Sequence, residues 1–279
     1  MKNEHILIIL IIAIIAIVAI IFAIGVIALL CFVVTNTPTT VDNVKQVERD
    51  QTFSGSLASY NHVDLTVSDV NGNVEVRAGN GDAFAIDVYE KGTEAGLQRY
   101  YVDYSQSSIA GNKTISLIVR DNMSGIPTNS QYSADIIVTV PGNMSYSMNL
   151  ADVNGDIMSG PFYGTKSVMT NVNGRITSAF SADEATFSDV NGDVDVTTSK
   201  TAGRINADNV NGGIEVSVPE DAGYSLSAHV VNGGIVVPAH LNTTENSRFA
   251  VIGSTPGYAG NGLRLDLTTV NGRIAVNTI

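Results

Sequence analysis

The sequence predicts an all-β fold in which strand–turn–strand repeats of about 20 residues stack into a β-solenoid-like domain. Three observations support this prediction. A Val-Asn-Gly motif recurs seven times, an apolar β-branched residue lies two positions after each motif glycine, and an uncharged stretch of 29 residues near the N-terminus has the length of one transmembrane helix. A sheet rich in hairpins is expected between that helix and the main run of repeats.

The seven motifs define the repeat length. Their turn residues are Asn71-Gly72, Asn154-Gly155, Asn173-Gly174, Asn191-Gly192, Asn211-Gly212, Asn232-Gly233 and Asn271-Gly272. Successive asparagines are 83, 19, 18, 20, 21 and 39 residues apart, so the usual step is close to 20. The last step is nearly double, and Val251-Ile252-Gly253 lies near its midpoint. This spacing predicts an eighth, degenerate unit there.

The chemistry of the motif predicts a tight turn between two strands. Glycine adopts positive φ freely, and asparagine tolerates it better than most residues. The valine before the asparagine and the Val or Ile after the glycine favour extended backbone, and both are expected to point inward. Two short strands cannot bury their own apolar face, so neighbouring units must stack, with the asparagines in a ladder along the stack.

The N-terminal segment predicts a membrane anchor. Residues 6–34 would form a helix about 44 Å long, against a hydrocarbon core of about 30 Å. A cleaved signal peptide is the alternative, but its apolar region is usually only about 7 to 15 residues long. The positive-inside rule places residues 1–5 in the cytoplasm and the chain beyond residue 35 outside the cell. The bilayer is therefore an expected partner, through residues 6–34.

Three further regions follow the predicted helix. Residues 35–50 are polar and indicate a stalk. Residues 51–145 form an N-terminal β region, which contains the first repeat and predicted strands at 83–90, 100–105, 114–121 and 133–140. Residues 146–279 form the Val-Asn-Gly β-repeat region, in which 181–185 is predicted to be a loop. The long strands of the second region are expected either to be inserted into the stack or to cover its open end, and an open end needs such a cover.

Oxygen-bearing side chains around two motifs raise the question of calcium binding. Asp152 to Asp156 and Asp189 to Asp193 carry them at alternate positions. An EF-hand loop also needs glycine at its sixth position and glutamate at its twelfth, where this chain has Ile157 and Tyr163. Stacking would instead align Asp156, Arg175 and Asp193 in a column of alternating charge. No metal or cofactor is predicted.

The sequence offers little basis for catalysis. Its four histidines, His5, His62, His229 and His240, lack metal-ligand spacing, and no nucleophile or phosphate-binding motif occurs. The acidic turns leave a polysaccharide-cleaving enzyme as one alternative. A net charge of −12 argues against a nucleic-acid partner.

The repeated [Asp/Asn]-Val-Asn-Gly-x-[Ile/Val] units, on a Ser- and Thr-rich all-β region, resemble the prokaryotic putative-adhesin family over residues 50–279. The resemblance implies a membrane-anchored surface module without catalytic residues, with a surface glycan or an envelope protein as its partner. A structural or regulatory envelope component that works with another membrane protein is the other alternative. The sequence does not determine the oligomeric state.

Overall fold

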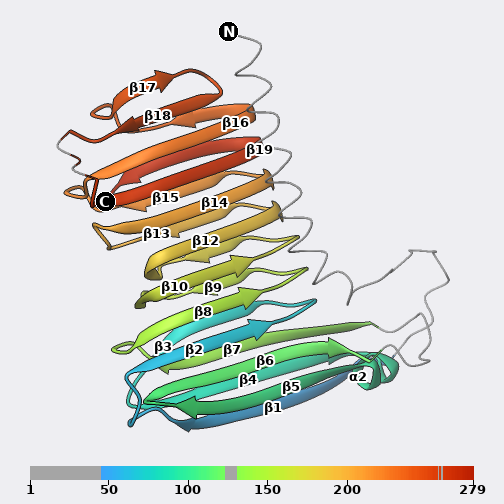
Figure 1. Ribbon diagram of the computed structural model, residues 1–279. Helices are drawn as coiled ribbons and strands as arrows, with labels where there is room; N and C mark the ends of the chain where they lie inside the picture. Colours follow the sequence, from blue (N-terminus) through green and yellow to red (C-terminus); the bar gives the residue numbers. More distant parts are fainter. Residues whose placement is uncertain (1–44, 123–130, 257, 259) are drawn as a thin grey trace, which may run out of the picture.

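The computed structural model describes residues 45–122, 131–256, 258 and 260–279, and it is built almost entirely from β-strands (Figure 1). The strands are β1 (Val47–Ser56), β2 (His62–Ser68), β3 (Val74–Gly79), β4 (Ala83–Gly92), β5 (Tyr100–Ile109), β6 (Asn112–Asp121), β7 (Tyr132–Pro141), β8 (Ser145–Ala151), β9 (Ile157–Ser159), β10 (Tyr163–Thr170), β11 (Ile176–Ser178), β12 (Ser181–Asn191), β13 (Val194–Thr197), β14 (Gly203–Asn211), β15 (Ile214–Val218), β16 (Tyr224–Val236), β17 (Asn242–Asn246), β18 (Ala250–Ser254) and β19 (Leu263–Thr278). A short helix, α2 (Glu94–Arg99), joins β4 to β5. The predicted all-β class is confirmed.

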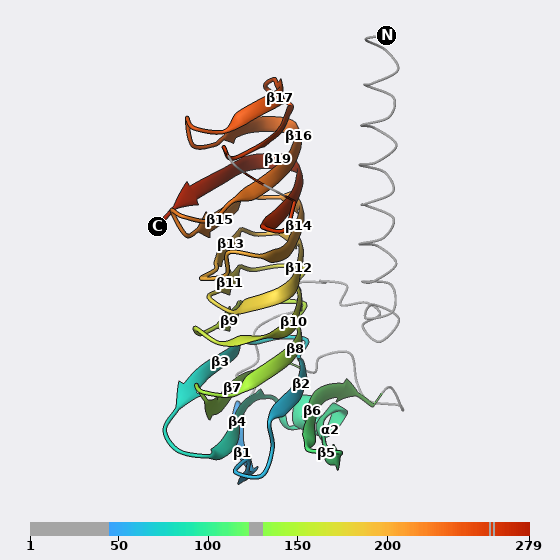
Figure 2. The same ribbon diagram turned by 60° about the vertical axis from the view of Figure 1, so that its left-hand side comes forward.

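The strands form one hydrogen-bonded sheet that is bent into two walls (Figures 1 and 2). The first wall has the order β5-β6-β2-β8-β10-β12-β14-β19-β16-β18-β17. The second has the order β1-β4-β7-β3-β9-β11-β13-β15-β19. Between β2 and β16 and between β7 and β15, neighbouring strands are parallel. The walls meet at the Val-Asn-Gly motifs, so each repeat contributes one strand to each wall.

The last repeat of the chain does not occupy the last level of the stack. Strand β19 lies between β14 and β16, pairing Asn271 with Asn211 on one side and with Asn232 on the other. The eighth unit predicted around Val251 is wrong, because that residue lies in β18, which is antiparallel to β16 and β17. The long step between the sixth and seventh motifs therefore holds a hairpin that covers the edge of β16.

The core lies between the walls. The residues two positions after six of the motif glycines are almost completely buried: Val74, Ile157, Ile176, Val194, Ile214 and Ile274. Facing side chains from the first wall include Leu65, Met148 and Phe187. The valine that precedes each asparagine is only half-buried, as at Val153 and Val190, so its predicted inward orientation is wrong. Strand alternation instead buries the polar residue that comes before that valine.

The N-terminal strands close one end of the stack. Phe53 of β1 stacks on Tyr104 of β5, with ring centroids 4.3 Å apart, and so joins the outer strands of the two walls. Strand β1 starts at Val47, which pairs with Gly92, so the last four residues of the predicted stalk belong to the sheet. The helix α2 was not predicted; its N-cap, Thr93, accepts a hydrogen bond from Gly96 N.

Two further expectations concern local structure. The predicted loop at 181–185 is wrong, because these residues begin β12, where Ala182 and Ala185 are buried and pair with β10. No helix in the described part of the chain has the length and hydropathy of a membrane span. The segment 6–34, which carries that prediction, lies outside the described residues.

Candidate functional site

The seven motif asparagines form one continuous ladder of side-chain amides. The donor Nδ2 and acceptor Oδ1 atoms are 2.7 Å apart for Asn154 to Asn71, 2.8 Å for Asn173 to Asn154, 2.9 Å for Asn191 to Asn173, 2.8 Å for Asn211 to Asn191, 2.8 Å for Asn271 to Asn211 and 2.8 Å for Asn232 to Asn271. Each inner asparagine therefore donates to one neighbour and accepts from the other. The ladder holds adjacent repeats in register along the corner between the walls.

The motif glycines are required mainly because the repeats approach closely at this corner. A methyl group on Gly155 would lie 1.5 Å from the carbonyl oxygen of Gly72, and one on Gly192 would lie 1.6 Å from that of Gly174. The corresponding contacts of Gly72, Gly174, Gly212, Gly233 and Gly272 are 1.6–2.1 Å. Positive φ is an added reason at five of the motif glycines, Gly72, Gly155, Gly174, Gly212 and Gly233, but not at Gly192 and Gly272, so close approach is the reason that all seven share. Among the described residues Ala110 is the one non-glycine with positive φ, so the motif asparagines do not adopt it. The motif asparagines therefore serve the ladder.

A column of buried polar side chains lies just inside the asparagine ladder. It was not predicted from the sequence. It occupies the position two residues before six of the seven asparagines, the seventh position being Val230, and consists, in stack order, of Asp69, Asp152, Asn171, Asp189, Asn209 and Thr269, all at most 2% exposed. The recurring polar residue at this position was visible in the sequence. Strand alternation counted forward along the preceding strand, from Met148 and Leu150 to Asp152, identifies this position as internal.

The predicted column of alternating charge is present on the outside of the second wall. The Arg175 guanidinium contacts Asp193 at 3.2 Å and Asp195 at 3.6 Å, and its backbone N–H donates to Asp156 at 2.8 Å. Gly213, next along this column, leaves a depression of about 280 Å³ that Arg273 also lines. Burial raises the pKa of Asp195, and Arg175 opposes that shift. No group of His, Cys, Asp and Glu in the described ranges has the arrangement of a metal site.

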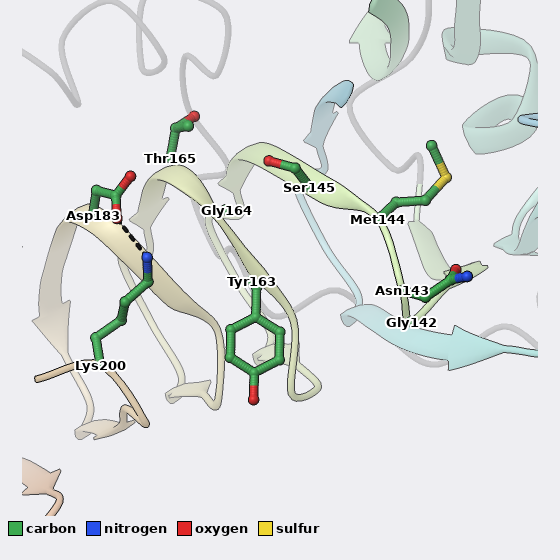
Figure 3. A pocket seen from close by; sticks show the side chains of 9 residues that line it. All are labelled: Gly142, Asn143, Met144, Ser145, Tyr163, Gly164, Thr165, Asp183 and Lys200. Atoms are coloured by element: carbon green, nitrogen blue, oxygen red, sulfur yellow. Dashed lines mark hydrogen bonds and ion pairs between the residues drawn. The ribbon is translucent and has the colours of Figure 1, made fainter. Parts of the chain in front are cut away.

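A hollow lies at the edge of the first wall opposite the asparagine ladder, and its lining residues are shown in Figure 3. Its volume is about 480 Å³, and it is lined by Gly142, Asn143, Met144, Ser145, Tyr163, Gly164, Thr165, Asp183 and Lys200. These residues come from four successive levels of the stack. Tyr163 is 57% exposed, although a tyrosine side chain is commonly mostly buried. The hollow combines one free aromatic face with hydroxyl, amide, carboxylate and ammonium groups.

A local irregularity in β10 shapes this hollow. The pairing of β10 with β8 shifts register between Gly164 and Lys166, so Thr165 bulges and reaches Ser147 at 3.0 Å between hydroxyl oxygens. A methyl group on Gly164 would lie 1.9 Å from the Tyr146 carbonyl oxygen, so glycine is needed beside the bulge. On the far side, Lys200 Nζ binds Asp183 Oδ1 at 2.5 Å. Bulges of this kind often re-aim side chains at binding sites.

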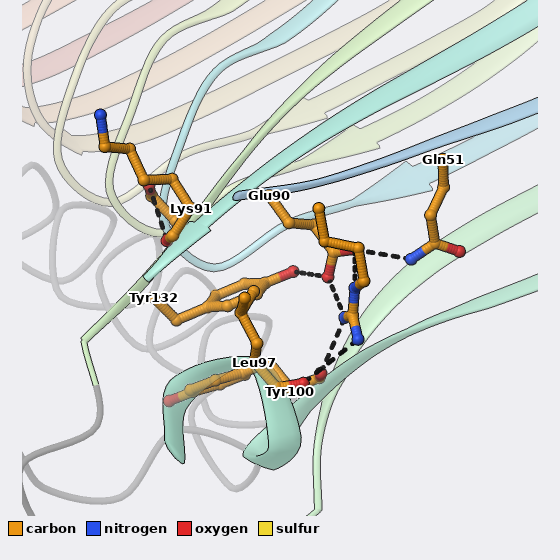
Figure 4. A network of polar contacts seen from close by, with 8 residues as sticks. Gln51, Glu90, Lys91, Leu97, Tyr100 and Tyr132 are labelled. Atoms are coloured by element: carbon orange, nitrogen blue, oxygen red, sulfur yellow. Dashed lines mark hydrogen bonds and ion pairs between the residues drawn. The ribbon is translucent and has the colours of Figure 1, made fainter. Parts of the chain in front are cut away.

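A second polar cluster, around Glu90, stabilises the closed end of the stack (Figure 4). Glu90 is 1% exposed, and Arg49 donates to its two carboxylate oxygens at 2.6 and 2.5 Å. Gln51 and Tyr132 donate to the same carboxylate at 2.6 and 3.0 Å. Burial alone would raise the pKa of Glu90, but these donors and the Arg49 charge outweigh it and lower that pKa. Every group in the cluster is partnered, which indicates a structural role.

The three histidines in the described residues lie apart from one another. His62 lies within 3.0 and 2.9 Å of the Ser145 and Ser147 hydroxyls, on the outside of the first wall. His229 contacts Ser227 on a different level. His240 is exposed, in the turn between β16 and β17.

Comparisons with known proteins show a likeness in fold. No protein-family model and no curated protein matches the chain. A solved structure described as a "putative cell adhesion protein" from Clostridium sporogenes ATCC 15579 is similar with a TM-score of 0.51 and 10% identity, over 84% of this chain and 100% of that chain. At this identity, the likeness is one of fold.

Two further solved structures are described as putative adhesins. The protein from Bacteroides fragilis NCTC 9343 has a TM-score of 0.30 and 12% identity, over 84% of this chain and 97% of that chain. The protein from Parabacteroides merdae ATCC 43184 has a TM-score of 0.23 and 7% identity, over 83% and 96%. These three solved structures are all of bacterial proteins described as putative adhesins or cell adhesion proteins.

Proposed function

We propose that this chain is a cell-surface adhesion module, in which a β-solenoid anchored through residues 6–34 presents the hollow around Tyr163 to a polyhydroxylated ligand such as a surface glycan. The observation that carries the proposal is the exposed Tyr163 ring within a hollow built by four levels of a rigid stack. An aromatic face binds the apolar side of a sugar ring, and the surrounding polar groups bind its hydroxyls.

The polar groups of the hollow suit binding better than bond cleavage. Asp183 and Lys200 already form an ion pair, so neither is free to act as a general acid or base. Ser145, Thr165 and Asn143 supply neutral donors and acceptors along the rim. A single site of this size gives modest affinity, and many anchored copies would supply avidity on a repetitive surface. The likeness to a structure described as a cell adhesion protein also supports this role.

The proposal is tested by binding of the full-length chain to a glycan array. Tyr163→Ala should reduce binding at least tenfold, whereas Tyr163→Phe should keep most of it, because the ring face remains. Tyr89→Ala, which removes a tyrosine with 45% exposure on β4, is the matched control and should bind normally. Equal binding by the two alanine variants, or binding to no glycan, would remove the support for this site.

A further inference from the structure

The column of buried polar residues just inside the asparagine ladder contains both amides and carboxyls in equivalent positions. Asn171 and Asn209 use Nδ2 to donate to the carbonyl oxygen of the glycine one repeat earlier, Gly155 at 2.8 Å and Gly192 at 2.7 Å. Thr269 does the same with its hydroxyl, which donates to Gly212 at 3.1 Å. Donation to the preceding glycine carbonyl is therefore a repeated feature of this column.

Asp152 and Asp189 occupy the same geometry with oxygen in place of nitrogen. One carboxylate oxygen, Oδ1, accepts from the next backbone N–H, at 2.6 Å for Asp152 and 2.7 Å for Asp189. Asn171 Oδ1 accepts from Val172 N at 2.8 Å in the same manner. The other oxygen of each aspartate, Oδ2, is buried without a hydrogen-bond partner. It stands where the asparagines carry their donor.

The contacts that an added methyl group would make on each motif glycine show how close the Oδ2 atoms lie to the carbonyl oxygen of the preceding glycine. The point where a methyl group would stand on Gly155 is 1.5 Å from the Gly72 oxygen and 2.6 Å from Asp152 Oδ2. On Gly174, the same point is 2.0 Å from the Gly155 oxygen and 3.0 Å from Asn171 Nδ2. The point on Gly192 is 1.6 Å from the Gly174 oxygen and 2.7 Å from Asp189 Oδ2. Two bare oxygens so placed would repel each other.

We propose that Asp152 and Asp189 are neutral carboxylic acids in the folded chain, and that their Oδ2–H groups donate to the carbonyl oxygens of Gly72 and Gly174. A proton on Oδ2 replaces the repulsion between this oxygen and the glycine carbonyl oxygen with a hydrogen bond. The Asn171 and Asn209 amides make the equivalent hydrogen bond at any pH. Folding is therefore coupled to proton uptake. Loss of these protons weakens the contacts between adjacent repeats at the corner between the two walls. This inference is independent of ligand binding at Tyr163.

The neighbouring carboxyl groups, when ionised, favour the protonated form of Asp152 and Asp189. Asp69, Asp135 and Asp156 face Asp152, and Asp156 and Asp193 face Asp189. The nearby Arg175 guanidinium is paired with Asp193 and Asp195. Tyr132 lies toward Asp69. Burial, with these neighbours, raises the pKa of Asp152 and of Asp189 to about 7.

The direction of the pH dependence follows from these values. An aspartate whose pKa is raised in the folded state contributes stability below its unfolded pKa, about 3.9, and that contribution is lost as pH rises through about 7. The ratio of folded to unfolded chain should fall about a hundredfold per carboxyl between pH 5 and pH 8. Salt-bridged carboxylates have the opposite dependence, so single substitutions are needed to isolate these two residues.

The test is denaturant unfolding of the full-length chain at pH 5 and pH 8. Asp152→Asn and Asp189→Asn should each raise the folded-to-unfolded ratio by about a thousandfold at pH 8 and by only about tenfold at pH 5, relative to the unchanged chain, and so flatten the pH dependence. The matched reverse variant, Asn171→Asp, should fold at pH 5 and lose stability at pH 8. Unchanged pH dependence in all three variants would overturn the proposal.

A spectroscopic measurement on the unchanged chain does not depend on the variants folding. Infrared spectra should contain the carbonyl band of protonated carboxyl groups at pH 5.5, where exposed aspartates are ionised. Burial also raises the pKa of Asp69 well above its usual range, so Asp69 contributes to this band. The part of the band that comes from Asp152 and Asp189 should disappear by pH 8.5. Its loss from the Asp152→Asn, Asp189→Asn double variant assigns it to these residues. Absence of the band at pH 5.5 would show that both carboxyls are ionised and that the proposal is wrong.

Discussion

The Asn271 side chain donates to Asn211 at 2.8 Å, although the two residues are 60 positions apart and another motif asparagine, Asn232, lies between them in the sequence. Asn232 in turn donates to Asn271. The C-terminal strand is therefore inserted between two repeats that are consecutive along the chain. Folding must leave this level open until β19 has been synthesised, so the C-terminal residues complete the sheet.

Hydrogen exchange should show that the C-terminal strand is part of the stable core. A terminal segment usually frays, but β19 has partners on both sides. The amides of Leu265 and Ile274 should therefore exchange as slowly as those of Ile205 and Ile214 in the adjacent strands. Mass-spectrometric exchange of peptides from these strands checks this, and rapid exchange of β19 alone would contradict the inserted order.

Gly155→Ala should prevent normal stacking. Its new methyl group would lie 1.5 Å from the Gly72 carbonyl oxygen, and backbone atoms of the neighbouring repeat cannot move aside cheaply. We expect a loss of more than about 4 kcal/mol, the exceptional end of single substitutions. Gly234→Ala is the control, because nothing lies within 4 Å of its added methyl group. Denaturant unfolding should separate the two, and similar stabilities would refute close approach as the reason for the motif glycine.

Asn173→Ala should weaken the corner without abolishing the fold. Asn173 donates to Asn154 and accepts from Asn191, so the substitution removes two hydrogen bonds and leaves two amides without that partner. Each such bond contributes about 0.5–1.5 kcal/mol, so a loss of about 1–3 kcal/mol in unfolding free energy is expected. Asn149→Ala, at an exposed position of β8, should change stability by less than about 0.5 kcal/mol. Equal losses of unfolding free energy in Asn173→Ala and Asn149→Ala would mean that the asparagine ladder does not contribute to stability.

Lowering the pH should destabilise the Glu90 cluster at the closed end of the stack, whereas it should stabilise the corner that contains Asp152 and Asp189. The pKa of Glu90 is lowered in the folded state by hydrogen bonds from Arg49 and Gln51, against the effect of burial. Its contribution is therefore complete above the unfolded pKa of about 4.3 and is lost as pH falls below that value. Arg49→Ala should destabilise the chain by about 1–3 kcal/mol at pH 7, because Arg49 itself is partly exposed, and by less at pH 3. Arg77→Ala, an exposed arginine on β3, serves as the control in the same unfolding series.

Several features of the site could be predicted from the recurrence of the motif. The strands of the N-terminal region, the burial of the residue after each turn and the aspartate–arginine column follow from alternation and repeat length, which act locally. The hollow around Tyr163 could not be predicted. It depends on a one-residue bulge at Thr165 and on residues from four levels that are brought together only when the levels stack.

The sequence alone determined the repeat, its length, its all-β class and the position of its turns, because side-chain alternation and turn chemistry depend on residues only a few positions apart. Tertiary structure decided which side of each strand is internal at the corner, since that depends on where the backbone bends rather than on hydropathy. It also decided the order of the last levels. The strands that carry Asn211 and Asn232 could each pair with any repeat of the same pattern. Only the packing of the whole domain places Asn271 between them.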